Sequence, residues 1–369
     1  MKNKELHYFI GSCLALGSSA EDTKRLETVI REKPIGWNRF VSVCSNNLVL
    51  QTLFVKFRDH KLLDSIPPDL ADYLQEIYEL NLERNRQILL QIAELNRALN
   101  HSDIRPIYIK GAGNLIDNLY GDKGERILAD IDLLVDESDF LKAAAVVEAM
   151  GYSTLQHSWE EVSQMMHYPT FHKAGMPAPV EIHRAPVMLG YSRGLNAKMV
   201  SEEKKAAKGL EGCDVPSDRH KAHINFIHSQ LSNKGNISGR VSMRDLYDLW
   251  LLSQRLDLKE AFDAFPYRGK AKSYLLLMDL LFGTHVGTAY QRGFSDRVFL
   301  MHFNLNLSSR FYYTSFKYAL SLFELVFVSY LGRIPAMLFN PSLRRSTFRK
   351  LASREWYKTH FSTFKERFR

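Results

Sequence analysis

The hydrophobic pattern divides the chain into a helical part, a mixed part and a second helical part. Over residues 66–100, apolar positions recur at the three- and four-residue spacing of a helix, and Pro67-Pro68 marks the start. Strand-like runs occur only between residues 106 and 184, and helical patterns return over residues 220–231 and 242–254. This order predicts an α+β protein, with a small mixed β-sheet flanked by N-terminal and C-terminal helical regions.

Two aspartates stand one residue apart in the apolar run of residues 129–135. On a β-strand, Asp130 and Asp132 would point to one side, while Ile131 and Leu133 would point to the other. Carboxylates held side by side repel each other unless a cation sits between them, and their oxygens suit Mg²⁺ or Mn²⁺ better than zinc. Because bound Mg²⁺ commonly takes further ligands from substrate phosphates, the pair also predicts a phosphate substrate.

A glycine-rich turn precedes this run. The segment 106–109 reads as a short strand, Gly111 and Gly113 read as a tight turn, and an apolar pattern from Leu115 onward reads as a helix. Backbone N–H groups at such a turn can cradle phosphate oxygens. The turn therefore agrees with the phosphate substrate predicted from the aspartates.

A third carboxylate is offered by Glu181. Residues 168–173 and 179–184 alternate in polarity around a turn at 174–177, which predicts a β-hairpin. The alternation places Glu181 and His183 on one face, and we expect Glu181 to lie beside Asp130 and Asp132. His183 is interpreted either as a partly buried structural side chain or as a ligand or acid–base group.

Together these motifs resemble the polymerase-β-type nucleotidyltransferase superfamily. More narrowly, the chain resembles the bacterial family usually labelled uncharacterised nucleotidyltransferase, over roughly Trp37 to Leu252. The residues that carry the resemblance are Lys110-Gly111, Tyr120, Arg126, Asp130-Ile131-Asp132, Glu181-Ile182-His183, His223, His228 and Arg244 to Asp248.

The resemblance implies a metal-dependent enzyme that moves an NMP group from an NTP to an unknown hydroxyl or phosphate acceptor. The acceptor could be a small molecule, a polysaccharide precursor, a peptide or a protein. The implied catalytic and metal residues are Asp130, Asp132 and Glu181, with Mg²⁺ or Mn²⁺. The implied nucleotide-binding residues are Lys110, Gly111, Gly113, Arg126 and Arg244.

Two departures from the superfamily pattern affect these roles. Ala112 stands where members commonly carry a serine that touches a nucleotide phosphate, so Lys110 would supply charge there instead. The third acid, Glu181, is glutamate where aspartate is common.

Several of these residues could instead have a structural role. Arg126 is either a loop charge that neutralises nearby acids or a group that grips the triphosphate. Arg244 lies four residues before Asp248 on a predicted helix, which predicts an ion pair between them; the alternative places Arg244 near the nucleotide. His223 and His228 are predicted to be structural.

The composition indicates in which cellular compartment the protein works. The chain has 369 residues, and its three cysteines are too far apart for a disulfide framework or a zinc site, which favours the cytoplasm. The apolar stretch at residues 8–20 superficially resembles a signal peptide, but its glycines and serines favour an amphipathic helix. The run from Tyr318 to Phe339 is too short and too charged for a confident membrane span.

Nearly all of the net charge of +8 lies in the last 29 residues, which contain nine basic and two acidic residues. Aromatic side chains are interleaved with these charges. The tail therefore suits an anionic membrane surface or RNA, with peripheral membrane location, or it is a solvated tail docked on the body.

The predicted organisation has four parts. Residues 1–100 form an N-terminal helical region, 101–215 the nucleotidyltransferase core, 216–340 a C-terminal helical region and 341–369 the basic aromatic tail. Two other classes of function stay open: a toxin–antitoxin component that modifies RNA or protein, and a catalytically silent nucleotide-binding homologue.

Overall fold

The computed structural model describes residues 1–17, 20–155, 162, 165–287, 290–323, 344–345, 347–348, 352–358 and 362. By its internal contacts the chain divides into two compact units, Met1–Phe303 and Asn304–Arg369. The site described below lies in the first unit. Most of the basic tail, and most of the run from Tyr318 to Phe339, lie outside the described residues.

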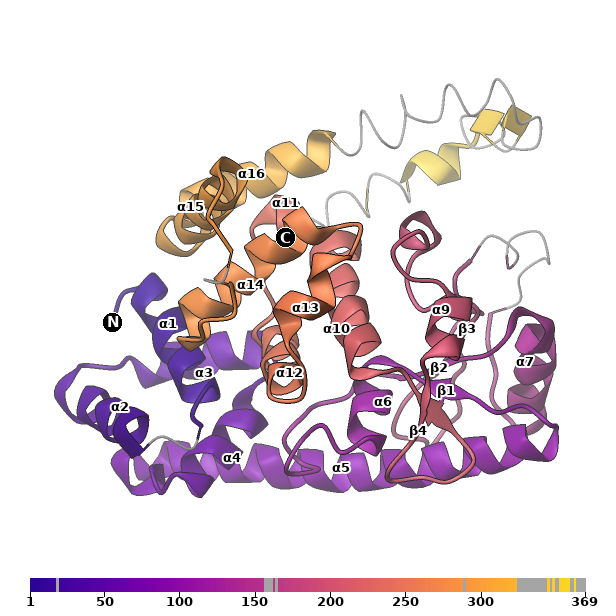
Figure 1. Cartoon of the computed structure of the whole chain (residues 1–369), viewed down its shortest axis with the longest axis horizontal. Coiled ribbons are helices and arrows are strands. Elements are labelled where there is room, and N and C mark those ends of the chain that lie inside the picture. Colours follow the sequence, from indigo (N-terminus) through magenta and orange to yellow (C-terminus); the bar gives the residue numbers. More distant parts are fainter. Residues whose placement is uncertain are drawn as a thin grey trace. The chain divides into compact units, whose positions relative to one another are not determined.

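The first unit begins with five α-helices, the last of which is long. They are α1 (Asn3–Leu14), α2 (Ala20–Glu32), α3 (Trp37–Asn46), α4 (Leu50–Asp59) and α5 (Pro68–His101). Pro68 starts α5, as predicted, because proline lacks only an N–H that the first helical turn leaves unpaired. Figure 1 shows α5 running beneath the unit, and it packs against α4 towards one end and α7 towards the other.

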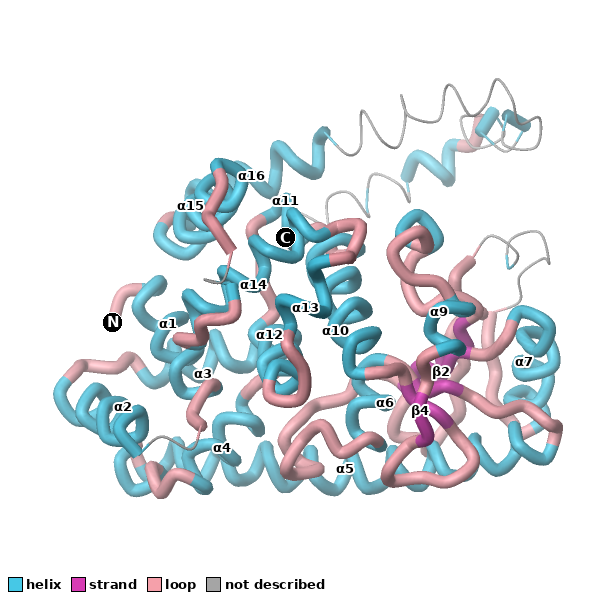
Figure 2. Tube along the Cα trace, in the orientation of Figure 1, coloured by secondary structure: helices cyan, strands magenta, loops and turns pink. Residues whose placement is uncertain are grey.

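The sheet is small, mixed and confined to one part of the unit (Figure 2). Its strand order is β3-β2-β1-β5-β4. The strands and the helices between them are β1 (Ile107–Tyr108), α6 (Lys110–Ile116), β2 (Ile131–Leu134), α7 (Phe140–Ala149), β3 (Val180–His183), α9 (Ala197–Glu202), β4 (Lys205–Ala206) and β5 (Asp214–Val215). The predicted α+β class is confirmed.

The predicted hairpin before Glu181 forms only in part. Phe171 pairs with Val180, and His167 pairs with His183, as isolated antiparallel bridges, so only the second arm becomes a continuous strand. The main partner of β3 is instead β2, and the two run parallel.

Helices return after the sheet, as the pattern predicted. They are α10 (Asp218–Phe226), a π-helical turn (Ile227–Ser232), α11 (Gly235–Ser238), α12 (Met243–Ser253), α13 (Leu258–Asp263), α14 (Arg268–Phe282), α15 (Phe294–Ser308) and α16 (Arg310–Phe323). Ser242 caps α12 by accepting a hydrogen bond from the Asp245 N–H.

In the described part of the chain, no single helix has the length and apolar character needed to cross a membrane. Helices α3 and α4 taken together have that length and apolar character, but the chain bends by 118° between them.

Candidate active site

The pairing of β2 with its two neighbours assembles the site. β3 runs parallel to β2 with Glu181 opposite Asp132, so the predicted meeting of these two acids takes place. On the other edge of β2, the Ile109 N–H donates to the Asp132 carbonyl at 3.1 Å. Lys110 follows directly, and its side chain therefore starts beside Asp132.

Asp132 is buried and already has two positively polarised partners. Its Oδ1 accepts from Lys110 Nζ at 2.6 Å and lies 2.8 Å from His183 Nε2. Its Oδ2 is buried with no hydrogen-bond partner. Burial alone would raise the pKa of Asp132, but Lys110 and His183 hold it well below its ordinary value. Asp132 is therefore an ionised carboxylate with one oxygen unused.

His183 ties the two acids together. An ionised carboxylate can only accept, so His183 Nε2 carries the hydrogen that points at Asp132. The same nitrogen lies 3.5 Å from Glu181 Oε2, while Thr170 Oγ1 donates to Glu181 Oε1 at 3.0 Å. The contact with His183 lowers the pKa of Glu181. Burial would lower the pKa of His183, but Asp132 and Glu181 raise it.

Asp130 lies one residue before β2, half-buried, at the wall of a cavity. Burial and the nearby charges of Asp132 and Glu181 raise its pKa to about 6, although Lys110 and Arg244 act in the opposite direction. Burial is the main cause, and it disfavours the ionised form of Asp130. A bound cation would favour that ionised form.

This group of side chains fits a divalent metal. Asp132, Glu181 and His183 each offer a ligand atom, and these atoms lie within 4.8 Å of one another. The unused Oδ2 of Asp132 is an oxygen donor that needs a positive partner. A metal-bound histidine usually donates its second ring N–H to an oxygen, whereas His183 Nδ1 is buried without a partner. The carboxylate oxygens are therefore the better ligands, and His183 orients them.

The cavity has a volume of about 260 Å³. On one side it is lined by α6 and the loop before β2, with Gly111 and Asp130, and on the other by α10, the π-helical turn and α12. Its cationic lining residues are Lys110, Arg126, Lys221 and Arg244. Asp130, Asp245 and Asp248 line the same cavity and offset part of this positive charge. Four cations around one cavity suit an anionic ligand such as a polyphosphate.

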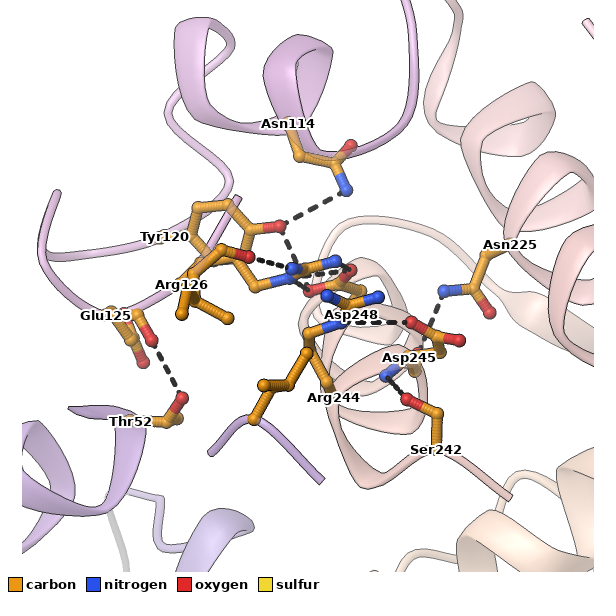
Figure 3. Close-up of polar contacts among 12 residues, drawn as sticks. Thr52, Asn114, Tyr120, Glu125, Arg126, Asn225, Ser242, Arg244, Asp245 and Asp248 are labelled. Atoms are coloured by element: carbon orange, nitrogen blue, oxygen red, sulfur yellow. Dashed lines mark hydrogen bonds and ion pairs between the residues drawn. The ribbon is translucent and has the colours of Figure 1, made fainter. Parts of the chain in front are cut away.

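Arg126 is buried and fixed by Asp248 of α12 (Figure 3). Its Nε donates to Asp248 Oδ1 at 3.0 Å and its Nη2 donates to Oδ2 at 2.9 Å. The Tyr120 hydroxyl donates to the same carboxylate at 3.0 Å, and the Ile127 carbonyl accepts from Arg126 Nη1. The interpretation of Arg126 as an exposed loop charge is therefore wrong, and its contact with a nucleotide stays a prediction.

The predicted ion pair between Arg244 and Asp248 is also wrong. Arg244 Nε lies 3.5 Å from Asp245 Oδ1 instead, without a hydrogen bond (Figure 3). Asp248 instead forms an ion pair with Arg126, which donates two parallel hydrogen bonds to it from the loop before β2. Arg244 thus keeps its donors for the cavity that it lines.

Gly111 and Gly113 do not form the predicted tight turn, because α6 begins at Lys110 and contains both. The two glycines have different surroundings. Gly111 lines the cavity. Gly113 lies inside α6, its N–H donates to the Ile109 carbonyl, and a Cβ at this position would come within 2.2 Å of the Tyr108 carbonyl oxygen. Gly113 is therefore required for the close packing of α6 on β1; its predicted contact with phosphate is untested.

Replacing Gly113 with alanine is expected to destabilise the protein by about 3 kcal/mol, because the new methyl group must push α6 away from backbone that cannot yield. Urea unfolding followed by circular dichroism measures this change. Gly121→Ala is the matched control, since a Cβ there meets nothing within 4 Å, and it should shift stability by less than about 0.5 kcal/mol. Equal stability of both variants would contradict the packing role of Gly113.

Sequence reasoning missed the residues that hold the backbone of the site. Amides on α5 donate to the loops that lead into β2 and β3. Asn85 Nδ2 donates to the carbonyls of Lys123 and Arg126 at 2.6 and 2.8 Å, and Gln91 Nε2 donates to the Ala178 carbonyl at 2.7 Å. Asparagine and glutamine on the buried face of a long amphipathic helix were the available signal.

His228 was predicted to be structural, but it lines the cavity together with Lys221 and Asn225. Burial lowers its pKa, so the ring is biased towards the neutral form. The spacing of these three residues, i, i+4 and i+7, marks one helical face and could have indicated it. His223 does have structural contacts: its Nε2 lies 2.8 Å from the Ala261 carbonyl oxygen, and its ring stacks on Phe265.

Comparison with known proteins agrees with this site. A family model described as uncharacterised nucleotidyltransferase matches residues 33–286, more than half of the chain. No curated protein and no solved structure matches the chain significantly. The matched range contains the three acids, Gly111, Gly113 and the cavity helices α10 and α12. The chain therefore belongs to the uncharacterised nucleotidyltransferase family and is a transferase of nucleotide groups.

Proposed function

We propose that the protein transfers an NMP group from an NTP to a hydroxyl or phosphate acceptor, with Mg²⁺ or Mn²⁺ as the metal. The observation that carries the proposal is the register of β2 and β3. It pairs Asp132 with Glu181 on the sheet, with Asp130 one residue before β2 at the wall of the cationic cavity.

Asp130, Asp132 and Glu181 would hold the metal through carboxylate oxygens. When bound, such a metal stabilises negative charge on the attacking and leaving oxygens of an in-line displacement. His183 keeps Asp132 and Glu181 in place through its Nε2. Lys110 and Arg244 contribute positive charge at the cavity, and Gly111 leaves room for close approach of phosphate to the backbone.

The direct test offers each of the four NTPs, labelled at the α-phosphate, with Mg²⁺ or Mn²⁺ and a host-cell extract. We expect metal-dependent transfer of the α-label to a cellular component, and release of unlabelled pyrophosphate. The purified protein without extract controls for self-labelling. A parallel reaction uses NTPs labelled at the γ-phosphate. If the γ-label is transferred and the α-label is not, the enzyme is a phosphoryl transferase and the proposal fails.

The same experiment separates the two other classes of function. Label recovered in RNA or in a single partner protein would favour the toxin–antitoxin type. Nucleotide binding without transfer to any acceptor would favour a catalytically silent homologue. Neither class has a contact in the described residues that favours it over the proposal.

Glu181→Gln is expected to lower turnover about 10²-fold while part of the nucleotide affinity is retained, because Asp130 and Asp132 still offer oxygen ligands. Single-turnover kinetics and equilibrium binding of the same NTP measure the two effects separately. Thr170→Val removes the hydroxyl that donates to Glu181 and serves as the milder companion variant. Unchanged turnover in Glu181→Gln would show that Glu181 is not the third catalytic carboxylate.

Two further proposals rest on the sequence alone. The cytoplasm is the proposed compartment because the three cysteines are free. The basic tail at residues 341–369 is proposed to contact an anionic membrane surface or RNA, on the strength of its charge and its interleaved aromatic residues.

A further inference from the structure

Lys110 forms an ion pair with Asp132, the carboxylate that would bind the proposed metal. Its Nζ lies 2.6 Å from Asp132 Oδ1, and the Asp132 side chain is 1% exposed. His183 contacts the same oxygen. A cation that approaches the unused Oδ2 therefore meets a carboxylate whose charge is already neutralised at contact distance, with an ammonium group that repels it.

The backbone holds Lys110 in this place. Its φ is +52°, a left-handed conformation that residues other than glycine and asparagine rarely adopt. On one side, Ile109 is hydrogen-bonded to the backbone of Asp132; on the other, α6 begins at Lys110 itself. Because the surrounding structure fixes this strained position, movement of Lys110 is restricted to its side chain.

The side chain has a second partner within reach. Lys110 also lines the cavity, where Asp130 and Arg244 lie. A lysine ammonium is a compact charge on a flexible stem with three donors, so it can turn to a second anion that replaces the charge of Asp132. A polyphosphate in the cavity would compete with Asp132 for it.

We propose that Lys110 couples metal binding to nucleotide binding. With the cavity free of nucleotide, its ammonium stays on Asp132 and opposes the metal. The phosphates of an NTP draw the ammonium into the cavity, and Asp132 then becomes available to the metal. This inference rests on the proposed function, because it takes Asp132 as a metal ligand and a polyphosphate as the cavity's occupant.

The test measures the affinity for Mn²⁺ alone, by electron paramagnetic resonance of the free ion, without nucleotide. Lys110→Met should raise that affinity at least about tenfold, since a neighbouring opposite charge shifts the proton affinity of a carboxylate by about 1–3 pKa units. Lys110→Arg keeps the charge and should keep the affinity low. Inorganic tripolyphosphate in metal-free buffer should bind more weakly to Lys110→Met than to the wild type.

Arg244→Met is the matched control, because it removes a positive charge from the same cavity without touching Asp132. It should weaken tripolyphosphate binding yet change Mn²⁺ affinity much less than Lys110→Met does. If Lys110→Met does not fold, Lys110→Asn replaces it, since asparagine tolerates the positive φ.

The outcomes separate this inference from the proposed function. If Lys110→Met binds Mn²⁺ no more tightly than the wild type, while Asp132→Asn weakens Mn²⁺ binding, the coupling is overturned and the metal site stands. If no variant, including Lys110→Met, binds Mn²⁺ measurably, both ideas are overturned. Tight Mn²⁺ binding by Lys110→Arg would also overturn the coupling, because it would show that charge is not the cause.

Discussion

Asp130→Asn and Asp132→Asn are both expected to lower nucleotidyl transfer by at least roughly 10²- to 10³-fold, but to change stability in opposite directions. The pKa of Asp130 is raised by burial and, less strongly, by the charges of Asp132 and Glu181, so its replacement removes a charge that the folded state disfavours. Asp132 is ionised, buried and paired with Lys110 and His183. Its replacement leaves a lysine and a histidine without their counter-charge, at a cost of about 3 kcal/mol.

The stability difference for Asp130→Asn should depend on pH. Folding raises the pKa of Asp130 from 3.8 to about 6, so ionisation of this group disfavours the folded state above pH 6. Below about pH 4 the carboxyl is protonated in both the folded and the unfolded state, so Asp130→Asn should not change the free energy of unfolding. Above pH 6 the increase in the free energy of unfolding should reach its full size. Denaturant unfolding in the presence of a chelator measures it. A loss of stability at pH 7 in Asp130→Asn would contradict the raised pKa of Asp130.

The second large effect concerns the ion pair that joins the loop before β2 to α12. Asp248→Asn is expected to destabilise the protein by about 3–5 kcal/mol, because Arg126 is buried and would lose its counter-charge. The change should also lower the affinity for nucleotide, since Arg126 and Arg244 line the same cavity. Chemical unfolding and nucleotide binding of the same variant measure the two consequences.

Two controls make this prediction specific. The double variant Arg126→Met with Asp248→Asn removes both charges and should cost much less than the sum of the two single changes. Glu27→Gln breaks the exposed pair with Arg31 and should cost less than about 1 kcal/mol. Additive losses in the double variant would show that Arg126 and Asp248 do not depend on each other.

Parts of the site could be predicted because they depend on local periodicity. Alternation with a period of two indicated that Glu181 and His183 share a face. The change from strand to helix after residue 109 was also indicated, but the glycines expected in a turn lie inside α6. The same rule of alternation expects Asp130 and Asp132 to point to one side, and this stays a prediction, because Asp130 lies just before β2, where it lines the cavity. Periodicity describes a regular strand, and Asp130 lies outside it.

The sequence by itself determined the α+β class, the boundaries of the main helices and the approach of Glu181 to Asp132, because each follows from spacing within a short segment. Only the tertiary structure decided which cation meets which acid. Lys110 pairs with Asp132 across 22 residues, and Arg126 pairs with Asp248 across 122 residues. These partners are chosen by which charges become buried together when β1, β2 and α12 pack, since a buried charge must find a partner within contact distance.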